Sequence, residues 1–335
     1  MDKFKKWRRK QKSATDVSDV RETTHLTRSS TASEEPPPPR NETDPPLPAP
    51  HQPSSLKFGL KLLHDCPNAD VDICFVHGLT GDRDKTWIAV GQTTPWPKLL
   101  LPSKLNARLL MYGYDAHVTR KSVASSNRLI NHAQNLLGDL TADRSICNAS
   151  SRPFIFVAHS LGGLVCKKAI LLSQNAAERE SRALFDCLEG IAFMGTPHKG
   201  AWMADWAKIP ASVFGLVKST NVTLLDILQR DNQLLNSIQL DFLTMIRRLR
   251  ESGRGIGVTC FFEELPFPVV GRIVTEESAT LDGYEIYSIY ANHRDMVRFG
   301  SEEDPGFKRL LWKLLAWTPQ VGKILHAHCY RTSPN

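Results

Sequence analysis

The sequence predicts one α/β domain, built on a mostly parallel sheet with helices on its faces. Short apolar runs of strand length recur along the chain and alternate with segments whose apolar residues have helical spacing. Several of the runs are apolar at nearly every position, as is typical of central strands that are buried on both faces. Strands and helices that alternate in this way indicate parallel strands joined by crossover helices.

The predicted strands are six apolar runs: VDICFVH (71–77), RLLMYGY (108–114), FIFVAHS (154–160), GIAFMGT (190–196), VTCFFEE (258–264) and YEIYSIY (284–290). The predicted helices are Ser125 to Leu140, Leu161 to Gln174, Val222 to Arg250 and Gly306 to Trp317. We therefore expect the domain over residues 56–325, followed by a C-terminal tail, residues 326–335.

Residues 1–55 have a different composition. Residues 13–55 are rich in Ser, Thr, Glu and Pro, so they cannot bury enough apolar surface to offset their ordering entropy, and we expect a disordered tail. Residues 1–12 hold seven basic side chains and one acidic one, which leaves 35 basic and 34 acidic side chains in the other 323 residues. The net charge of +7 therefore describes the tail, and we expect no nucleic-acid partner.

The sequence also bears on compartment and cofactors. No secretory apolar stretch follows the basic start, and no apolar run approaches the ~18 residues that span a bilayer. We expect a cytoplasmic protein, with residues 1–12 as a candidate contact to an anionic intracellular membrane surface. The seven cysteines have no CxxC spacing, so we expect neither a metal site nor a cofactor. The pattern gives no indication of oligomeric state.

Residues 200–250 interrupt the alternation, because they are too long for a single crossover between two strands. They carry apolar side chains such as Trp202, Trp206 and Phe214 ahead of a helix. Such an insertion is typical of a lid over an active site. Ordinary packing of a helix against the sheet is the alternative interpretation.

The strongest chemical signal is the segment FIFVAHSLGGLVCKKAI. An apolar strand ends at His159, Ser160 follows, and a helical pattern begins directly after it. This context is that of the nucleophile elbow, Gly-x-Ser-x-Gly, of the α/β-hydrolase fold. The sharp turn requires small residues two positions before and after the serine, which are Ala158 and Gly162, and Gly163 gives room for the helix to approach. We predict that Ser160 is a nucleophile.

A second segment, VDICFVHGLTGDRDKTW, ends a strand at His77 and then enters a glycine-containing loop. In this fold the loop after that strand donates a backbone N–H to the oxyanion, together with the N–H that follows the nucleophile. The predicted oxyanion donors are Leu79 and Leu161. His77 precedes the nucleophile in chain order, so we expect a structural role for it.

A general base must take the proton of Ser160, and the base of this fold is a histidine that follows the serine and the acid in the chain. The histidines after Ser160 are His198, His293, His326 and His328. We predict His293, since it follows the last predicted strand. His198 precedes every acid candidate, and we assign it to the substrate pocket instead.

The acid is expected in the loop after the penultimate strand. Glu263 and Glu264 close that strand, while Glu276, Glu277 and Asp282 come later and are rivals. Solvated surface carboxylates would look the same in the sequence. We favour Glu263.

Six segments together carry a family resemblance: HGLTGDRDKTW, AHSLGGLVCKKAI, GTPHKG, CFFEE, IVTEESA and ANHRDM. They resemble the serine-active-site-containing lipid-remodelling hydrolases and the hydrolase modules at the N-terminus of fungal NACHT-type, NLR-like proteins. More distantly they are similar to GPI inositol-deacylases and bacterial lipases. The resemblance covers roughly residues 70–312. It implies a triad of Ser160, Glu263 and His293.

These observations predict a serine ester hydrolase of the lipase, phospholipase or esterase type, acting through an acyl-enzyme on a small-molecule or lipid ester. His198 and Trp202 are the candidate substrate-binding residues. The alternative is a catalytically silent module that keeps the fold for interaction or signalling, because fold alone does not imply activity.

Overall fold

The computed structural model describes residues 57–79, 81–116, 125–199, 232–268 and 271–319. All of them belong to one compact unit, Gln52–Asn335. The predicted tails 1–55 and 326–335, and residues 200–231 of the predicted lid, lie outside the described residues, so the predicted domain boundaries stay predictions.

A seven-stranded sheet forms the centre of the domain, with the strand order β1-β3-β2-β4-β5-β6-β7. The strands are β1 (Gly59–His64), β2 (Val71–Val76), β3 (Ala107–Gly113), β4 (Phe154–His159), β5 (Leu188–Met194), β6 (Gly257–Glu263) and β7 (Glu285–Ile289). Only β1 runs antiparallel among these strands, paired with β3. The predicted mostly parallel sheet is confirmed, and β1 is the strand that the apolar runs did not predict.

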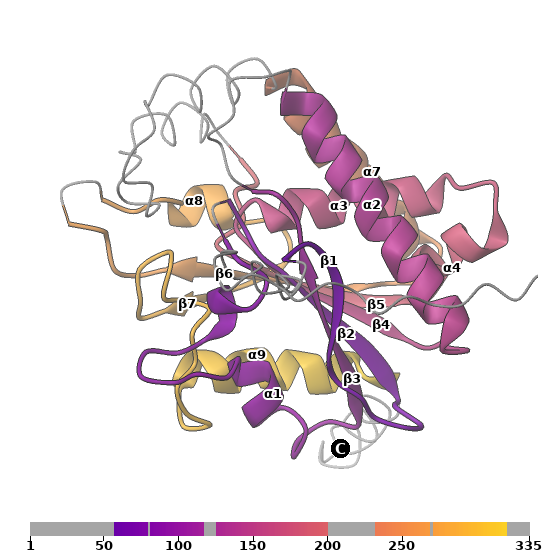
Figure 1. Cartoon of the computed structure of the whole chain (residues 1–335). Coiled ribbons are helices and arrows are strands. Elements are labelled where there is room, and N and C mark those ends of the chain that lie inside the picture. Colours follow the sequence, from indigo (N-terminus) through magenta and orange to yellow (C-terminus); the bar gives the residue numbers. More distant parts are fainter. Residues whose placement is uncertain (1–56, 80, 117–124, 200–231, 269–270, 320–335) are drawn as a thin grey trace, which may run out of the picture. The chain divides into compact units, whose positions relative to one another are not determined.

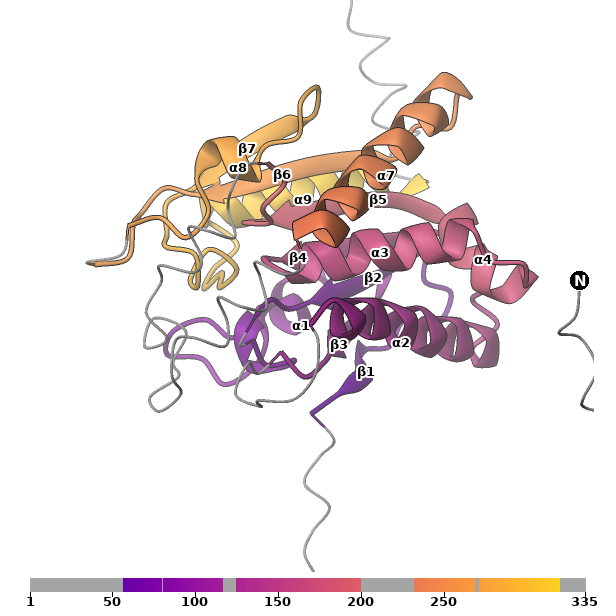
Figure 2. The same ribbon diagram turned by 90° about the horizontal axis from the view of Figure 1, so that it is seen from above.

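Helices cover both faces of the sheet (Figure 1). Seen from above, α2, α3, α4 and α7 lie over one face, and α9 lies beneath the sheet (Figure 2). The longer elements are α2 (Ser125–Ile146), α3 (Gly162–Gln174), α4 (Arg179–Asp186), α7 (Asn232–Glu251) and α9 (Pro305–Trp317), and the shorter ones are η1 (Lys85–Trp87), α1 (Trp96–Leu100) and α8 (Glu276–Ala279). No described helix is long and apolar enough to cross a membrane.

Alternate residues of the central strands point into two separate cores. On β2, Ile73 and Phe75 pack with α1 and α9, whereas Cys74 and Val76 pack with α2 and α3. All six residues of β2 are buried and all but Asp72 are apolar, which is why the run does not alternate between apolar and polar residues. The prediction of strands that are covered on both faces is confirmed.

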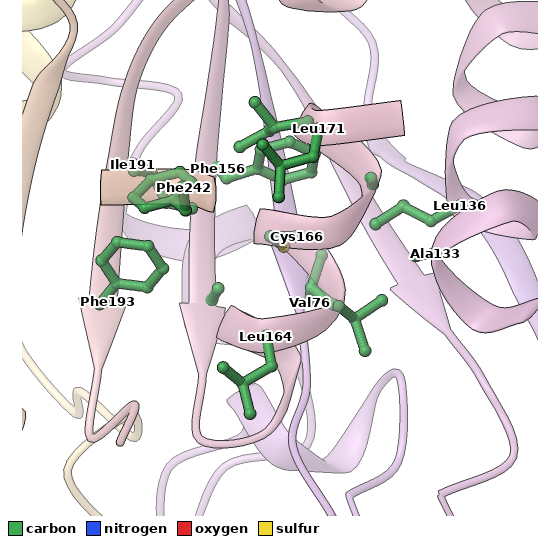
Figure 3. Packing of buried hydrophobic residues seen from close by; sticks show 14 of the residues in the cluster. Val76, Ala133, Leu136, Phe156, Leu164, Cys166, Leu171, Ile191, Phe193 and Phe242 are labelled. Carbon is green, nitrogen blue, oxygen red and sulfur yellow. The ribbon is translucent and has the colours of Figure 1, made fainter. Parts of the chain in front are cut away.

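The core on the α3 face holds the helix that follows the predicted nucleophile. Figure 3 shows apolar side chains of α2, α3, α7 and the sheet meeting there: Val76, Ala133, Leu136, Phe156, Leu164, Cys166, Leu171, Ile191, Phe193 and Phe242. Burial of a large apolar side chain contributes roughly 1.5–3 kcal/mol. The start of α3 is therefore fixed by packing on three sides.

Candidate active site

Ser160 lies in the sharp turn between β4 and α3. Its φ is +54°, a left-handed conformation that non-glycine residues seldom adopt, and its side chain is buried. The backbone N–H of Ser160 donates to the carbonyl of Met194, at the end of the neighbouring strand β5, over 2.9 Å. The turn thus has the strained backbone and the strand–helix context that the sequence predicts for a nucleophile elbow.

Small residues make this turn possible. A Cβ atom on Gly162 would lie 2.4 Å from the carbonyl oxygen of His77, and a Cβ atom on Gly163 would lie 2.3 Å from Oγ1 of Thr196. On the facing loop, a Cβ atom on Gly78 would lie 2.5 Å from Cβ of Ser160. These separations exclude any larger residue without a shift of the backbone. The predicted need for small residues at 162 and 163 therefore has a steric cause.

One predicted oxyanion donor, Leu161, directly follows Ser160, and the other, Leu79, lies in the loop that faces it. Leu161 is the N-cap of α3, and Leu79 follows Gly78, whose α-carbon faces the serine side chain. Neither backbone N–H donates to another residue within the described part of the chain. A helix N-terminus also carries partial positive charge, which favours an anion there.

Glu263 and His293 form a hydrogen-bonded pair. Oε2 of Glu263 lies 2.5 Å from Nδ1 of His293, although the two residues are 30 positions apart. A carboxylate accepts only, so Nδ1 carries a proton, and in the neutral ring Nε2 then keeps its lone pair. Oε1 of Glu263 accepts from the backbone N–H groups of Ile273 and Val274, over 2.5 and 3.2 Å. The carboxylate is fully buried and satisfied on both oxygens.

The sheet register brings these residues to one edge. His159 pairs with Met194, Met194 pairs with Phe261, and Glu263 pairs with Ile289, so β4 to β7 end together. The ring of His293 packs so closely on Gly195 that a Cβ atom there would lie 2.9 Å from Cε1. The nucleophile turn, the carboxylate and the imidazole therefore come from neighbouring strand ends.

The rival carboxylates lie elsewhere. Glu276 and Glu277 are exposed on α8, and Asp282 is exposed and forms an ion pair with Lys199. Glu264 is held through its backbone, whose N–H donates to the carbonyl of Ile289 and whose carbonyl accepts from Arg272. Of these five candidates, Glu263 is the one whose side chain is hydrogen-bonded to His293.

His77 supports the loop in front of Ser160. Its Nδ1 donates to the carbonyl of Gly78 over 2.9 Å, and its Nε2 accepts from the backbone N–H of Tyr114 over 3.3 Å. The two rings stack with centroids 4.6 Å apart, and the hydroxyl of Tyr114 donates to the carbonyl of His77. These contacts join the ends of β2 and β3, as the structural role predicted for His77 requires.

His198 lies in a buried polar chain on the α3 face. Its Nδ1 lies 2.6 Å from Nζ of Lys167, and its Nε2 lies 3.6 Å from Sγ of Cys260. Lys167 is fully buried, contacts Oε1 of Gln239, and lies over the rings of Phe193 and Phe242. The sequence did not single out Lys167. Burial lowers the pKa of Lys167 to about 7.

The remaining site predictions stay open. Trp202 lies outside the described residues, and the assignment of His198 to the substrate pocket stays a prediction. In the described part of the chain, no group of three or more His, Cys, Asp or Glu side chains could hold a metal ion.

Comparison with known proteins shows the family of this chain. The model of a family described as "Putative serine esterase (DUF676)" matches residues 73–240. Protein SERAC1 of Danio rerio is 28% identical over 266 residues, 72% of this chain and 38% of that protein, and the Homo sapiens protein is 26% identical over 257 residues, 68% of this chain and 36% of that protein. The chain thus spans little more than a third of these curated relatives.

Solved structures with low sequence identity to this chain were also found. A lipase-esterase related protein from Clostridium acetobutylicum has a TM-score of 0.42 and 10% identity, with 76% of this chain and 98% of that chain covered. The RedJ thioesterase from Streptomyces coelicolor has a TM-score of 0.38 and 13% identity, with 73% and 87% covered. The sheet order and the elbow after β4 identify the fold of this chain as that of the α/β-hydrolases.

Proposed function

Because the chain belongs to the family described as "Putative serine esterase" (DUF676), we propose that it hydrolyses esters with Ser160 as nucleophile, His293 as base and Glu263 as acid. The observation that carries the proposal is the buried hydrogen bond of Glu263 to His293, at the strand ends beside the strained Ser160. This pairing sets the imidazole tautomer that a base needs.

The chemistry proceeds in two halves. Oγ of Ser160 attacks the acyl carbon of the ester while its proton passes to Nε2 of His293. The N–H groups of Leu79 and Leu161 stabilise the oxyanion of the tetrahedral intermediate. The intermediate collapses, and the alcohol leaves with the proton of His293. Water then attacks the acyl-enzyme, gives its proton to His293, and the acid product leaves as that proton returns to Ser160.

Glu263 supports both halves without changing its own protonation. Its charge stabilises the imidazolium that forms when His293 takes the proton. The two backbone N–H donors hold the carboxylate in place during that step. Full burial removes water that would otherwise weaken the interaction.

The substrate class in this proposal is a small-molecule or lipid ester. Trp202, Trp206 and Phe214 supply apolar surface in the predicted lid, which favours an acyl chain, and His198 is the proposed polar residue near that surface. Residues 1–12 would add contact with an anionic membrane, at about 1 kcal/mol per basic residue near the surface. A cytoplasmic, peripheral location is part of the same proposal.

Labelling with an alkyl fluorophosphonate tests the proposal, because only an activated serine reacts. We expect the full chain to be labelled at Ser160 and to hydrolyse soluble esters from a panel of acyl lengths. Ser160→Ala should abolish both signals with a circular-dichroism spectrum like that of the wild type. An unreactive wild-type chain would instead favour the alternative, a catalytically silent module that keeps the fold for interaction or signalling.

A further inference from the structure

We infer that His159 is a positioning residue of this site, whose side chain couples the segment that carries the nucleophile to the segment that carries the base. The inference rests on the proposed function. In the elbow pattern this position is open to any residue, so the sequence gives it no role.

The coupling is a direct hydrogen bond. Nε2 of His159 lies 2.9 Å from the carbonyl oxygen of His293, across 134 positions of the chain. A carbonyl oxygen only accepts, so Nε2 of His159 carries the proton and donates. The residue next to Ser160 thereby holds the main chain at His293. Since His159 and His293 are both buried, loss of this donor would remove a buried hydrogen bond between two distant segments.

Two contacts then fix the base in different ways. Glu263 fixes the ring of His293 through Nδ1, and His159 fixes its backbone. With the first contact alone, the ring would keep its tautomer, but no hydrogen bond would tie the main chain at His293 directly to the residue next to Ser160. A misplacement of about 1 Å between reacting groups can cost about 10²-fold in rate.

The charge state of His159 suits this role. Its ring centroid lies 4.9 Å from that of His293, with the planes inclined by 38°. Burial, reinforced by the nearby charge of His293, holds the pKa of His159 well below its usual range. The ring therefore stays neutral, keeps its donor at Nε2, and adds no positive charge against the imidazolium that forms on His293.

The test compares His159→Gln with His159→Met. Glutamine can offer an N–H donor at about the reach of Nε2, whereas methionine fills the volume without a donor. We expect His159→Met to lower kcat on a soluble ester by about 10- to 100-fold at unchanged KM. His159→Gln should restore most of that loss, and the rate of fluorophosphonate labelling should follow kcat in both variants.

Ser173→Ala is the matched control, because it removes a buried hydroxyl at the far end of α3 that bonds the carbonyl of Ser181 and the N–H of Phe185. We expect it to lower the melting temperature without lowering kcat. A His159→Met enzyme with wild-type kcat and a lower melting temperature would overturn the inference. Equal losses in the glutamine and methionine variants would also overturn it, because the donor would then be irrelevant.

Hydrogen exchange tests the coupling without turnover. We expect the amides of residues 291–296 to exchange faster in His159→Met than in the wild type, and to be unchanged in Ser173→Ala. Unchanged amide exchange in His159→Met would contradict the inference, whatever the kcat of that variant. If Ser160→Ala retains activity, the proposed function fails, whereas the exchange result still decides whether His159 holds this loop.

Discussion

Two fully buried carboxylates, Asp72 and Glu263, lie at opposite ends of the sheet and are compensated in opposite ways. Asp72 lies near the start of β2, where three arginines surround it. Its oxygens accept from Arg108 over 3.1 and 3.2 Å, from Arg144 over 2.5 Å and from Arg152 over 2.8 Å. Every one of these partners is a permanent cation.

Glu263 closes β6 at the other end and has no permanent cation among its described partners. It is held by two backbone N–H groups and by His293, whose imidazole can accept a proton and release it again. The contrast teaches that a buried carboxylate has a structural role where all its partners keep their charge. A buried carboxylate can take part in catalysis where one of its partners can change its charge.

The largest effect should follow from Glu263→Gln. The amide keeps the volume but loses the charge that stabilises the imidazolium, so we expect kcat on a soluble ester to fall by about 10⁴-fold, with KM little changed. Glu264→Gln, Glu276→Gln and Asp282→Asn are the controls and should retain near wild-type turnover. Steady-state kinetics on the four variants would refute the assignment if Glu263→Gln stayed active and one of the others did not.

Asp72→Asn should have the reverse result, a loss of stability with unchanged turnover. Removal of the charge leaves three guanidinium groups, two of them buried, without their shared partner, and loss of one member of a buried ion network costs about 3–5 kcal/mol. We expect urea unfolding to show that loss in the free energy of unfolding. Turnover per fluorophosphonate-reactive molecule should match the wild type. A fall in turnover per reactive molecule would show that the two sheet ends are coupled, contrary to the comparison.

Lys167 extends the comparison from buried carboxylates to a buried cation. It is fully buried, and its described partners are neutral: His198, Gln239 and two aromatic rings. Its pKa falls from 10.5 to about 7, chiefly through burial. Between these values the unfolded chain binds one proton more than the folded chain, so the free energy of unfolding rises with pH, by up to about 1.4 kcal/mol per unit.

We expect that rise in the wild type between about pH 7 and 8.5, below the range in which thiols of the unfolded chain titrate. Lys167→Met should flatten it, and Lys168→Met, its partly exposed neighbour, should leave it unchanged. Urea unfolding at a series of pH values measures all three slopes. Equal slopes in wild type and Lys167→Met would mean that Lys167 keeps its ordinary titration when buried.

The smallest effect should follow from deletion of residues 1–55. The segment has no core-forming pattern, so we expect unchanged kcat on a soluble ester and an unchanged melting temperature. Binding to anionic vesicles should weaken if residues 1–12 contact the membrane. A chain that fails to fold after this deletion would place the domain boundary further toward the N-terminus.

The sequence predicted the parts of the molecule that have a strong local pattern. The runs that became β2 to β6 are largely apolar because both of their faces are covered, and the elbow around Ser160 has a fixed spacing. Strand β1, with the segment GLKLLH, escaped because it is an antiparallel edge strand that is only partly buried. Its mixed composition does not differ clearly from that of a loop.

Within the site, the prediction was limited by contacts between distant segments. Glu263 could be favoured over Glu264 by strand position, but only the pleat decides which of two adjacent side chains faces His293. The roles of His159 and Lys167 depend on partners 134 and 31 positions away. No spacing rule encodes such partners, so these residues had no signal in the sequence.

The backbone of Ser160 has a consequence for how such a chain can change over time. At a φ of +54°, a side chain costs roughly 1–2 kcal/mol that glycine would not. A lineage that no longer needed the nucleophile would gain stability from a single change to glycine. Its loop residue Gly78 would then lose one of the two neighbours that require its small size, and the carbonyl oxygen of His159 would remain as the other. Ser160 thus destabilises the fold relative to glycine, and a need for a reactive side chain at this position would explain why it is present.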